Sequence, residues 1–362
     1  MKNVLVTPLD WGLGHATRCV PIINELLKRD CNVFIGGCGD SLELLKKEFP
    51  ALPFFSLPAY RPVYPSSGSM VLKMFTQIPK FLTTVKQEHV AIEKIVKESK
   101  IDLVISDNRY GCWTSVIPSV FITHQTNLLL PKRFKWLTKT VRRLNLSLIR
   151  KFSTCWIPDY PDGRSLAGKL KSLGKRNLKI KIKYIGALSR FGQPTSREIL
   201  YDIVCVLSGP EPQRSALEQI AIDGLSRSGL RYFVVRGVVG QSNDAGSNHN
   251  QVNFLKGSDL QAIIEQSECV LARSGYSTIM DLAKLGKKAI FVPTPGQTEQ
   301  EYLAARLRAK GIAFSVAQEN FDIMDAWTRS RSFTGFNEFP GDVRLLTDAL
   351  DEIFTPKIPE QL

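Results

Sequence analysis

The stretch CVLARSGYSTIMDLAKLGKKAIFVPTPGQTEQE, residues 269–301, decides the fold of this chain. Its apolar run at 270–272 stops at Arg273-Ser274-Gly275, and apolar residues then recur at helical spacing up to Leu285. This order predicts a strand, a tight turn and a helix. A second apolar run at 289–292, followed by prolines and a glycine, predicts another buried strand and a loop.

The start of the predicted helix is suited to binding an anion. Its unpaired backbone N–H groups and the positive end of its dipole attract negative charge, and Gly275 lets a phosphate approach closely. Many strand–glycine–helix junctions bind nothing, so this pattern alone leaves phosphate binding and a purely structural turn open.

A second junction of the same kind begins the chain. Residues 3–7 predict a buried strand, and a loop with Gly12, Gly14 and His15 separates it from a helix expected at 19–28. Open α/β sheets bind ligands at the carboxyl ends of their strands. A helix N-terminus disfavours the imidazolium form, so we expect His15 to be neutral near pH 7 and available as a general base. The alternative is a histidine that only bonds the loop backbone.

Two further predicted strands end in polar residues. The strand at 103–106 leads to Asp107 and the strand at 119–123 leads to His124. Parallel strands share one functional edge, so both side chains should lie on the same rim as His15. Asp107 is expected to orient His15 or to contact substrate, and a cap or turn role is its alternative.

The alternation of strands and helices predicts an α/β fold with two Rossmann-like domains that face a cleft. The domains are expected at 1–186 and 201–340, with a linker at 187–200 and a C-terminal helix and tail at 341–362 that packs back on the first domain. Further strands are expected at 32–36, 54–57, 203–207, 231–235, 253–255 and 313–316.

Length and composition fit a globular protein of more than one domain. The chain has 362 residues, 43% of them hydrophobic, and contains neither a signal-like segment at its start nor an apolar run long enough to span a membrane. Its seven cysteines are scattered without a CxxC pair, which predicts reduced thiols and no metal site. We therefore expect a cytoplasmic protein.

The net charge of +14 is concentrated in one segment. Residues 131–183 contain 16 Lys and Arg against Asp159 and Asp162, and the rest of the chain is balanced. Within 128–152 a basic amphipathic helix with Trp136 is typical of proteins that bind an anionic membrane surface. A helix packed on the sheet with a solvated basic face is the alternative. No nucleic-acid motif accompanies the charge, so nucleic acid is the disfavoured partner.

Taken together, GLGH at 12–15, RSGYSTIMDLAKLG at 273–286 and FVPTPGQTEQEYLA at 291–304 resemble glycosyltransferases of the B-type fold, and family 28 among them. The resemblance covers about residues 1–30 and 250–310. It implies a metal-independent hexosyltransferase without a cofactor. Such an enzyme would move a hexose or hexosamine from a nucleotide sugar, UDP-linked, to a lipid-linked or glycan acceptor at the inner membrane face.

The resemblance also assigns roles to single residues. His15 matches the general base, and the remaining matches lie on the donor side: Ser208 and Gly209 at a phosphate loop, Leu255 at the uracil, Ser274 and Gly275 at the diphosphate, Asp281 at the ribose, and Gln300 and Glu301 at the sugar. Arg273, the first residue of the second motif, is also expected to bind the donor. Asp281 and Glu301 depart from the Glu and Gln of the family pattern. The departure at Glu301 leaves the donor sugar open.

Other functions remain as alternatives. The GxGHxxR pattern with His15 and Arg18 also resembles UDP-sugar hydrolases of nonulosonic acid synthesis, in which water replaces the acceptor. Nucleotide-sugar epimerases share the fold but need a different histidine pattern and further catalytic acids. A non-enzymatic protein that binds through its basic segment is the remaining possibility.

Overall fold

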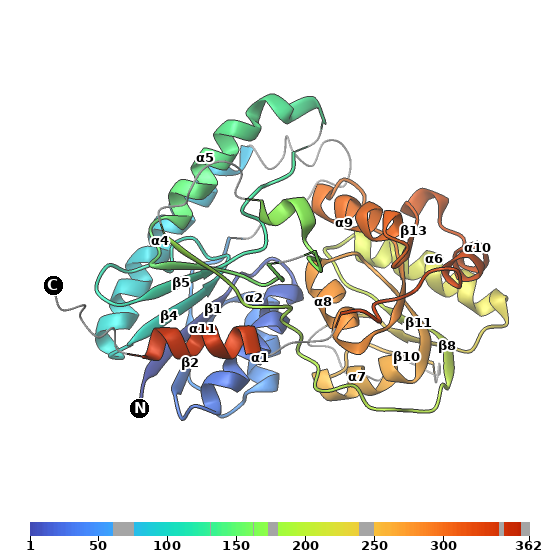
Figure 1. Cartoon of the computed structure of the whole chain (residues 1–362), viewed down its shortest axis with the longest axis horizontal. Coiled ribbons are helices and arrows are strands. Elements are labelled where there is room, and N and C mark those ends of the chain that lie inside the picture. The colour runs from blue at the N-terminus through green and yellow to red at the C-terminus, as the bar shows by residue number, and fades with distance from the viewer. Residues whose placement is uncertain are drawn as a thin grey trace.

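The computed structural model describes residues 1–60, 76–130, 132–161, 163–172, 180–238, 250–339 and 344–355. Figure 1 shows two lobes side by side, each built on a sheet that helices cover. The expectation of an α/β fold with two Rossmann-like domains is confirmed.

The first sheet consists, within the described residues, of seven parallel strands in the order β3-β2-β1-β4-β5-β6-β7. The strands are β1 (Asn3–Pro8), β2 (Asn32–Gly37), β3 (Phe54–Ser56), β4 (Leu103–Asp107), β5 (Ser119–Ile122), β6 (Thr154–Ile157) and β7 (Lys181–Tyr184). The helices of this lobe are α1 (Leu13–Leu27), α2 (Gly39–Glu48), α4 (Ile78–Glu98) and α5 (Thr138–Ile149), with 3-10 turns at Lys132–Leu137 and Gly168–Lys171.

The second sheet has, in the part of the chain that the structure describes, six parallel strands in the order β10-β9-β8-β11-β12-β13. They are β8 (Tyr201–Val206), β9 (Tyr232–Val235), β10 (Gln251–Val252), β11 (Ser267–Ala272), β12 (Lys288–Phe291) and β13 (Phe314–Ser315). The helices are α6 (Gln213–Ser228), α7 (Gly257–Glu265), α8 (Tyr276–Leu285), α9 (Thr298–Ala309), α10 (Ile323–Ser330) and α11 (Arg344–Phe354), with a 3-10 turn at Gln318–Asn320.

Several predicted boundaries are wrong. The helix expected from 19 already begins at Leu13, so Gly14 and His15 belong to the first turn of α1 and not to a loop. The strand expected at 253–255 lies at 251–252 as β10. The strands β6 and β7 and the helix α10 had no sequence prediction. Residues 341–343 and 356–362 of the predicted C-terminal segment lie outside the described residues.

Both sheets reverse their strand order at a single point, and ligands of open α/β sheets bind in the crevice at such points. In the first sheet the reversal lies between β1 and β4, where Pro8 pairs with Asp107. In the second it lies between β8 and β11, where Val206 pairs with Ala272. The predicted site residues at the two reversal points therefore lie at the end of a strand, at 107, or shortly after one, at 12–15, 208–209 and 273–275.

One apolar cluster extends through both lobes. It contains core residues of α1 and of α8, such as Ile22 and Ile279, which are fully buried. The helix α11 returns to the first lobe, as expected, and lies beside α1 in Figure 1. Leu350 of α11 is fully buried, and Asp351 pairs with Arg29 in the turn after α1. None of the described helices is long and apolar enough to cross a membrane.

Candidate active site

The first turn of α1 carries His15 to the carboxyl edge of the first sheet. Gly12 is the N-cap residue and has a φ of +80°, a conformation that side chains other than glycine rarely adopt. This turn lets the chain leave β1 and enter the helix at once. The first turn has neither an acidic residue nor a side-chain cap, so its N–H groups leave a positive dipole end beside His15.

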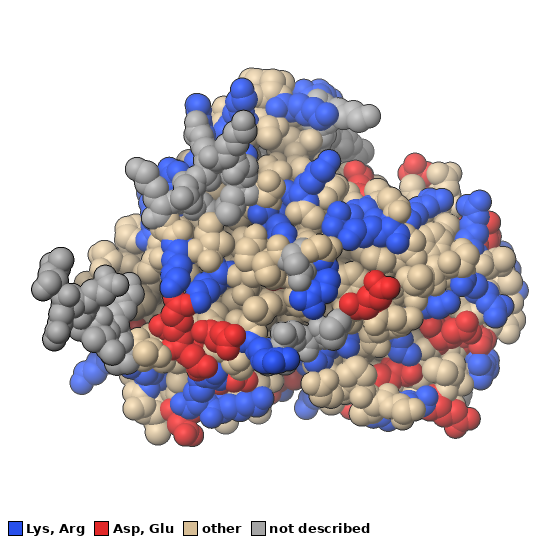
Figure 2. Space-filling view, in the orientation of Figure 1, with Lys and Arg blue, Asp and Glu red and all other residues tan. Residues whose placement is uncertain are grey.

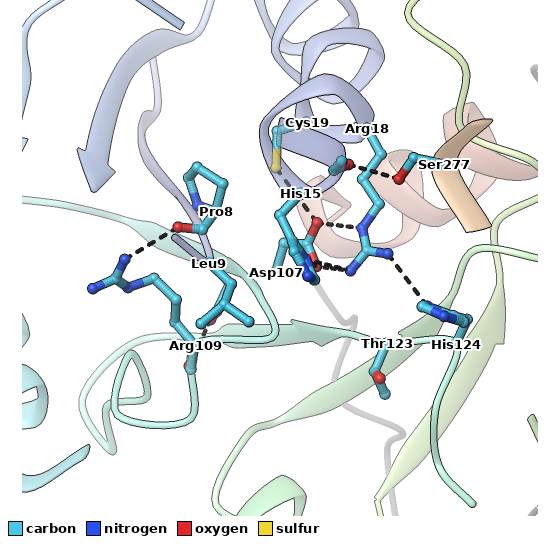
Figure 3. A network of polar contacts seen from close by, with 12 residues as sticks. Pro8, Leu9, His15, Arg18, Cys19, Asp107, Arg109, Thr123, His124 and Ser277 are labelled. Carbon is cyan, nitrogen blue, oxygen red and sulfur yellow. Dashed lines mark hydrogen bonds and ion pairs between the residues drawn. The ribbon is translucent and has the colours of Figure 1, made fainter. Parts of the chain in front are cut away.

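Figure 3 shows His15, Arg18 and Asp107 in direct contact. His15 Nδ1 lies 3.2 Å from Asp107 Oδ1 and 2.8 Å from Arg18 Nη2. Arg18 donates from Nε and Nη2 to both carboxylate oxygens of Asp107. Asp107 is fully buried and Arg18 is 2% exposed, so these charges pair away from solvent. The expected approach of Asp107 to His15 is therefore present, and Arg18 joins it.

The surroundings set the protonation of the pair. Burial and the guanidinium of Arg18 lower the pKa of His15, which leaves the imidazole neutral near pH 7. Burial alone would raise the pKa of Asp107, but Arg18 and His15 outweigh it and hold this pKa at about 2. The carboxylate is thus ionised beside a neutral ring, which is the state that a general base with an orienting acid requires.

His124 connects this cluster to the second domain. Its Nδ1 lies 3.3 Å from Arg18 Nη1, and its Nε2 lies 2.6 Å from Glu299 Oε1 at the start of α9. Gln125 also donates to Glu299. The ring of His124 stacks on Tyr276, the first residue of α8, with 4.1 Å between ring centroids. His124 is 3% exposed and lies in the interface between the domains.

The first turns of α1 and α8 touch. Ser277 Oγ of α8 donates to the carbonyl oxygen of Gly14 over 2.7 Å. A Cβ atom at position 14 would lie 2.9 Å from Ser277 Oγ, so glycine is needed there for the close approach. Two helix N-termini from different domains thus meet at the base of one site.

The donor-side residues lie around the N-terminus of α8. Gly275 is its N-cap residue, and no side chain caps the helix. Packing does not require glycine at this position, because the nearest atom to a Cβ would be Thr278 Oγ1 at 3.8 Å. Ser274 is fully buried and donates to the carbonyl oxygen of Gln300 over 2.8 Å. The N-terminus of α8 therefore lacks a side-chain cap within the described residues, and the space at Gly275 would admit a Cβ at ordinary contact distance.

Arg273 is a buried cation without a carboxylate partner among the described residues. Its guanidinium donates to the carbonyl oxygens of Val292, Pro293 and Gln213 and to Gln318 Oε1, while Nε has no hydrogen-bond partner in the described part of the chain. Burial lowers its pKa to about 10, so the residue stays charged at neutral pH. Arg273 ties together the loops around the α8 terminus and adds positive charge beneath it.

Nearby, Gly209 follows β8 with a φ of +111° and faces Thr294, whose hydroxyl is buried without a hydrogen-bond partner in the described residues. The preceding Ser208 is half-buried. The loops after β8, β11 and β12 thus converge on one face of the second domain. The Thr294 hydroxyl lies among them without a hydrogen-bond partner in the described residues.

Asp281 is engaged by the segment between the domains. Its carboxylate accepts the Ser189 hydroxyl over 2.7 Å and lies 3.3 Å from Arg190 Nε. Burial raises the pKa of Asp281, although Arg190 opposes the effect. Arg190 and Asp281 line a cavity of about 20 Å³ together with Phe191. A ribose at Asp281 would have to replace the hydroxyl of Ser189.

The remaining predicted donor residues support their own segments. Gln300 accepts the backbone N–H of Thr294 over 2.9 Å, and Glu301 accepts that of Gly296 over 2.9 Å. Leu255 lies between β10 and α7 and packs on the apolar core. The structure thus joins His15, Asp107 and His124 through Arg18, and it places Ser274 and Gly275 at the facing helix end. Leu255 and the side chains of Gln300 and Glu301 make their contacts elsewhere, although the Gln300 backbone accepts from Ser274.

Sequence reasoning gave no structural role to Arg18 and omitted Glu299 and Tyr276. Arg18 was visible as the last residue of GxGHxxR, but its contacts with Asp107 and His124 join positions 89 and 106 residues apart in the chain. Glu299 precedes Gln300 in the quoted motif and had no separate signal. No three His, Cys, Asp or Glu side chains form a metal-like group among the residues that the structure describes.

The second domain matches a known family. Residues 204–325 match the glycosyltransferase family 28 C-terminal domain. An uncharacterised glycosyltransferase of Methanosarcina acetivorans is 25% identical over 321 residues, which are 83% of this chain and 82% of the relative.

Two further proteins extend the comparison. The UDP-N-acetylglucosamine--N-acetylmuramyl-(pentapeptide) pyrophosphoryl-undecaprenol N-acetylglucosamine transferase of Methylobacterium sp. (strain 4-46) is 33% identical over 141 residues, 37% of this chain and 35% of that protein. The solved structure of spinosyn rhamnosyltransferase SpnG complexed with thymidine diphosphate superposes with a TM-score of 0.60 at 15% identity. It covers 98% of this chain and 96% of SpnG, so the likeness of fold includes both domains.

Proposed function

We propose that this chain, a family 28-like glycosyltransferase of the B-type fold, transfers a hexose or hexosamine from a UDP-linked donor to an acceptor hydroxyl, with His15 as the general base. One observation carries the proposal: His15 and the N-terminus of α8 meet across the domain interface, where Ser277 contacts Gly14. A base and an anion site on opposite walls of a cleft are the two groups that glycosyl transfer needs.

The proposed chemistry uses the neutral ring of His15. Its Nε2 takes the proton from the acceptor hydroxyl as that oxygen bonds to the anomeric carbon of the donor sugar. The bond from this carbon to the diphosphate oxygen breaks, and the electron pair leaves with the diphosphate. Asp107, ionised and 3.2 Å from Nδ1, orients the ring and stabilises the imidazolium that forms.

The leaving diphosphate is assigned to the N-terminus of α8. Free N–H groups and a helix dipole stabilise negative charge, and buried Arg273 adds a cation. We therefore propose that transfer proceeds without a metal cofactor. UDP is preferred as the nucleotide because the Methylobacterium relative is named for a UDP sugar, whereas SpnG was solved with thymidine diphosphate.

A nucleotide screen tests the donor side. UDP, GDP and TDP are added to the full chain, and the shift in thermal unfolding temperature is measured for each. We expect UDP to give the largest shift. If none of the nucleotides stabilises the protein, the donor assignment falls.

A histidine variant tests the base. His15→Ala is expected to keep UDP binding and to lose transfer, because it removes the base and leaves the α8 terminus intact. His89→Ala is the matched control, since His89 of α4 stacks on Trp113 away from the site. Full turnover in His15→Ala would remove the mechanism.

A UDP-sugar hydrolase is the second candidate function. The observation in its favour is that Arg18 of the GxGHxxR pattern contacts both His15 and Asp107. The same base would then activate water instead of a hydroxyl. Incubation with UDP sugars distinguishes the two, because fast release of free sugar without an acceptor favours the hydrolase.

We further propose a lipid-linked or glycan acceptor and a peripheral position on the cytoplasmic face of the inner membrane. The support is the basic segment: α5 packs on the first domain through Leu146 and Ile149, while Trp136 is 75% exposed. Figure 2 shows Lys and Arg side chains around the upper part of this lobe, where Figure 1 places α5. Exposed cations attract anionic lipid, each by about 1 kcal/mol.

Vesicle flotation tests this position. We expect the chain to float with vesicles that contain phosphatidylglycerol and not with pure phosphatidylcholine, and the binding to weaken as salt is added. Arg143→Ala and Trp136→Ala on the exposed face should reduce it, whereas Arg329→Ala on α10 serves as a control. Equal binding to both vesicle types, or binding to DNA or RNA instead, would contradict the proposal.

A further inference from the structure

Arg18 donates a hydrogen bond to Nδ1 of His15. This is the nitrogen through which a histidine general base normally donates to its orienting carboxylate. Arg18 Nη2 lies 2.8 Å from His15 Nδ1, whereas Asp107 Oδ1 lies 3.2 Å from the same nitrogen. A guanidinium nitrogen can only donate a hydrogen bond. Nδ1 therefore accepts from Arg18 and carries no proton in this arrangement.

This hydrogen bond determines the tautomer of the ring. A neutral imidazole has one N–H and one acceptor nitrogen, so an acceptor at Nδ1 means that Nε2 of His15 holds the proton. Nε2 is the nitrogen on the side of the ring away from Asp107. With a proton already in place it cannot take another from an acceptor hydroxyl, so the arrangement described here is a resting one.

We propose that Arg18 is a positioning residue that holds His15 in this resting tautomer until a nucleoside diphosphate binds and draws Arg18 Nη2 away. His15 Nδ1–H then donates to Asp107, and Nε2 becomes the free base. The inference rests on the proposed function, because it places the diphosphate at the N-terminus of α8. It makes the reaction ordered: the donor binds before His15 can deprotonate the acceptor.

The position of Arg18 explains how a diphosphate at α8 reaches it. Its Nη1 lies 3.3 Å from His124 Nδ1, and the His124 ring stacks on Tyr276 at the first residue of α8. The rings of His124 and Tyr276 therefore link the guanidinium to the first residue of α8. A diphosphate bound at α8 and the Arg18 guanidinium carry opposite charges, and such charges attract more strongly where they are shielded from water.

The ion pair of Arg18 need not break for this movement. Arg18 Nε donates to Asp107 Oδ2, while Nη2 serves Asp107 Oδ1 and His15 together. A rotation that withdraws Nη2 leaves the Nε contact in place. The charged groups that face His15 and His124 are Arg18, Asp107 and Glu299, one cation and two anions. A diphosphate that binds nearby therefore attracts Arg18, the one cation among these three groups.

Nuclear magnetic resonance of ¹⁵N-labelled histidine in the full chain tests the proposal at about pH 8, well above the ordinary histidine pKa of about 6.5. Two other histidines serve as internal references for the two tautomers. His89 Nδ1 lies 3.1 Å from the Trp113 carbonyl oxygen, so it must carry the proton. His124 donates from Nε2 to Glu299 and accepts from Arg18 at Nδ1. Single His→Gln variants assign the signals.

We expect His15 to show the Nε2–H tautomer without ligand and the Nδ1–H tautomer at saturating UDP, a change in the ratio of roughly 100-fold. The His89 signal should not move. An Nδ1–H tautomer in the ligand-free protein overturns the inference. UDP binding without a change of tautomer overturns the inference alone, whereas an absence of UDP binding overturns the proposed function as well.

The variant Arg18→Lys gives an independent measurement. A single ammonium nitrogen cannot contact Asp107, His15 and His124 together. We expect the ligand-free ring to move toward the Nδ1–H tautomer in this variant. Arg29→Lys, in the turn after the same helix and paired with Glu25 and Asp351, is the matched control and should leave the tautomer unchanged. An unaltered Nε2–H tautomer in a folded Arg18→Lys protein would contradict the role of Arg18.

Discussion

The buried pair of Asp107 and Arg18 predicts a pH-dependent loss of stability in Asp107→Asn. Both side chains are at most 2% exposed, and Asp107 accepts two hydrogen bonds from Arg18. Removing one partner of such a pair leaves the other charge buried and costs about 3–5 kcal/mol. We expect this loss in the free energy of unfolding of the first domain near neutral pH.

The pKa of Asp107 gives the second part of the prediction. It is about 2 in the folded protein, against about 3.9 in an unfolded chain. Because the folded value is the lower one, the stabilisation is complete above the unfolded pKa and is lost as the pH falls toward the folded pKa. Between about pH 7 and about pH 3 the linkage relation gives a loss of about 1.2 kcal/mol for the wild type. Asn cannot titrate, so the difference in the free energy of unfolding between the wild type and Asp107→Asn should be smaller by that amount at about pH 3.

Urea unfolding followed by tryptophan fluorescence measures this gap, because four of the five tryptophans, at 11, 113, 136 and 156, lie in the first domain. Asp102→Asn is the matched control: it makes the same change next to the other end of β4, where the side chain is 40% exposed. It should cost less than about 1 kcal/mol. A gap below about 1 kcal/mol for Asp107→Asn at neutral pH, or an equal gap at both pH values, would refute the reasoning.

Three further predictions concern the contacts between elements. Gly14→Ala places a Cβ 2.9 Å from Ser277 Oγ and should lower the thermal unfolding temperature, and adding Ser277→Gly should restore most of the loss. Leu350→Ala on α11, at a fully buried position, should cost about 2–5 kcal/mol in urea unfolding. His124 lowers the pKa of Glu299 against the effect of burial, so Glu299→Gln should cost about 1 kcal/mol above about pH 5. That difference should disappear as acid protonates Glu299 in the wild type, and an unchanged difference would contradict the pairing.

The chain order made the rim of the first sheet predictable. His15, Asp107 and His124 each follow a buried apolar run, and parallel strands bring their carboxyl ends to one edge. No knowledge of side-chain packing is needed for that step. The same argument predicted that residues 273–275 face these three side chains, because the second domain repeats the order of strand, glycine-containing turn and helix.

The edge of the first sheet was not predictable in the same way. β7 reads Lys-Ile-Lys-Tyr, so its charge hid a strand whose residues are mostly half-exposed. β6 has four residues and directly follows α5 and its turn. Short strands at or next to the edge carry too few apolar residues to show a period, and they form because neighbouring strands supply hydrogen bonds.

Arg18 and Glu299 show why the site itself was only partly predictable. Helical periodicity places Arg18 on α1, but it cannot say that the guanidinium faces the sheet edge with a carboxylate on one side and an imidazole on the other. Glu299 meets His124 from another domain, and the two residues are 175 positions apart in the chain. Such contacts depend on the relative orientation of the two domains, which a local sequence pattern does not encode.

The meeting of α1 and α8 connects the fold to the chemistry of transfer. Each helix presents its positive dipole end to the same interface, joined by the contact of Ser277 with Gly14. In the proposed transfer, burial and Arg18 keep His15 neutral before the reaction, and the end of α8 stabilises the charge that the departing diphosphate gains. The acceptor proton moves to His15 in the step that gives the leaving group its electron pair. Positive charge therefore forms on the ring, beside the Asp107 carboxylate, while negative charge forms on the diphosphate at the α8 end. The N-terminus of α8 and the Asp107 carboxylate are therefore suited to the transition state more than to the bound substrates, which is the condition for a gain in rate.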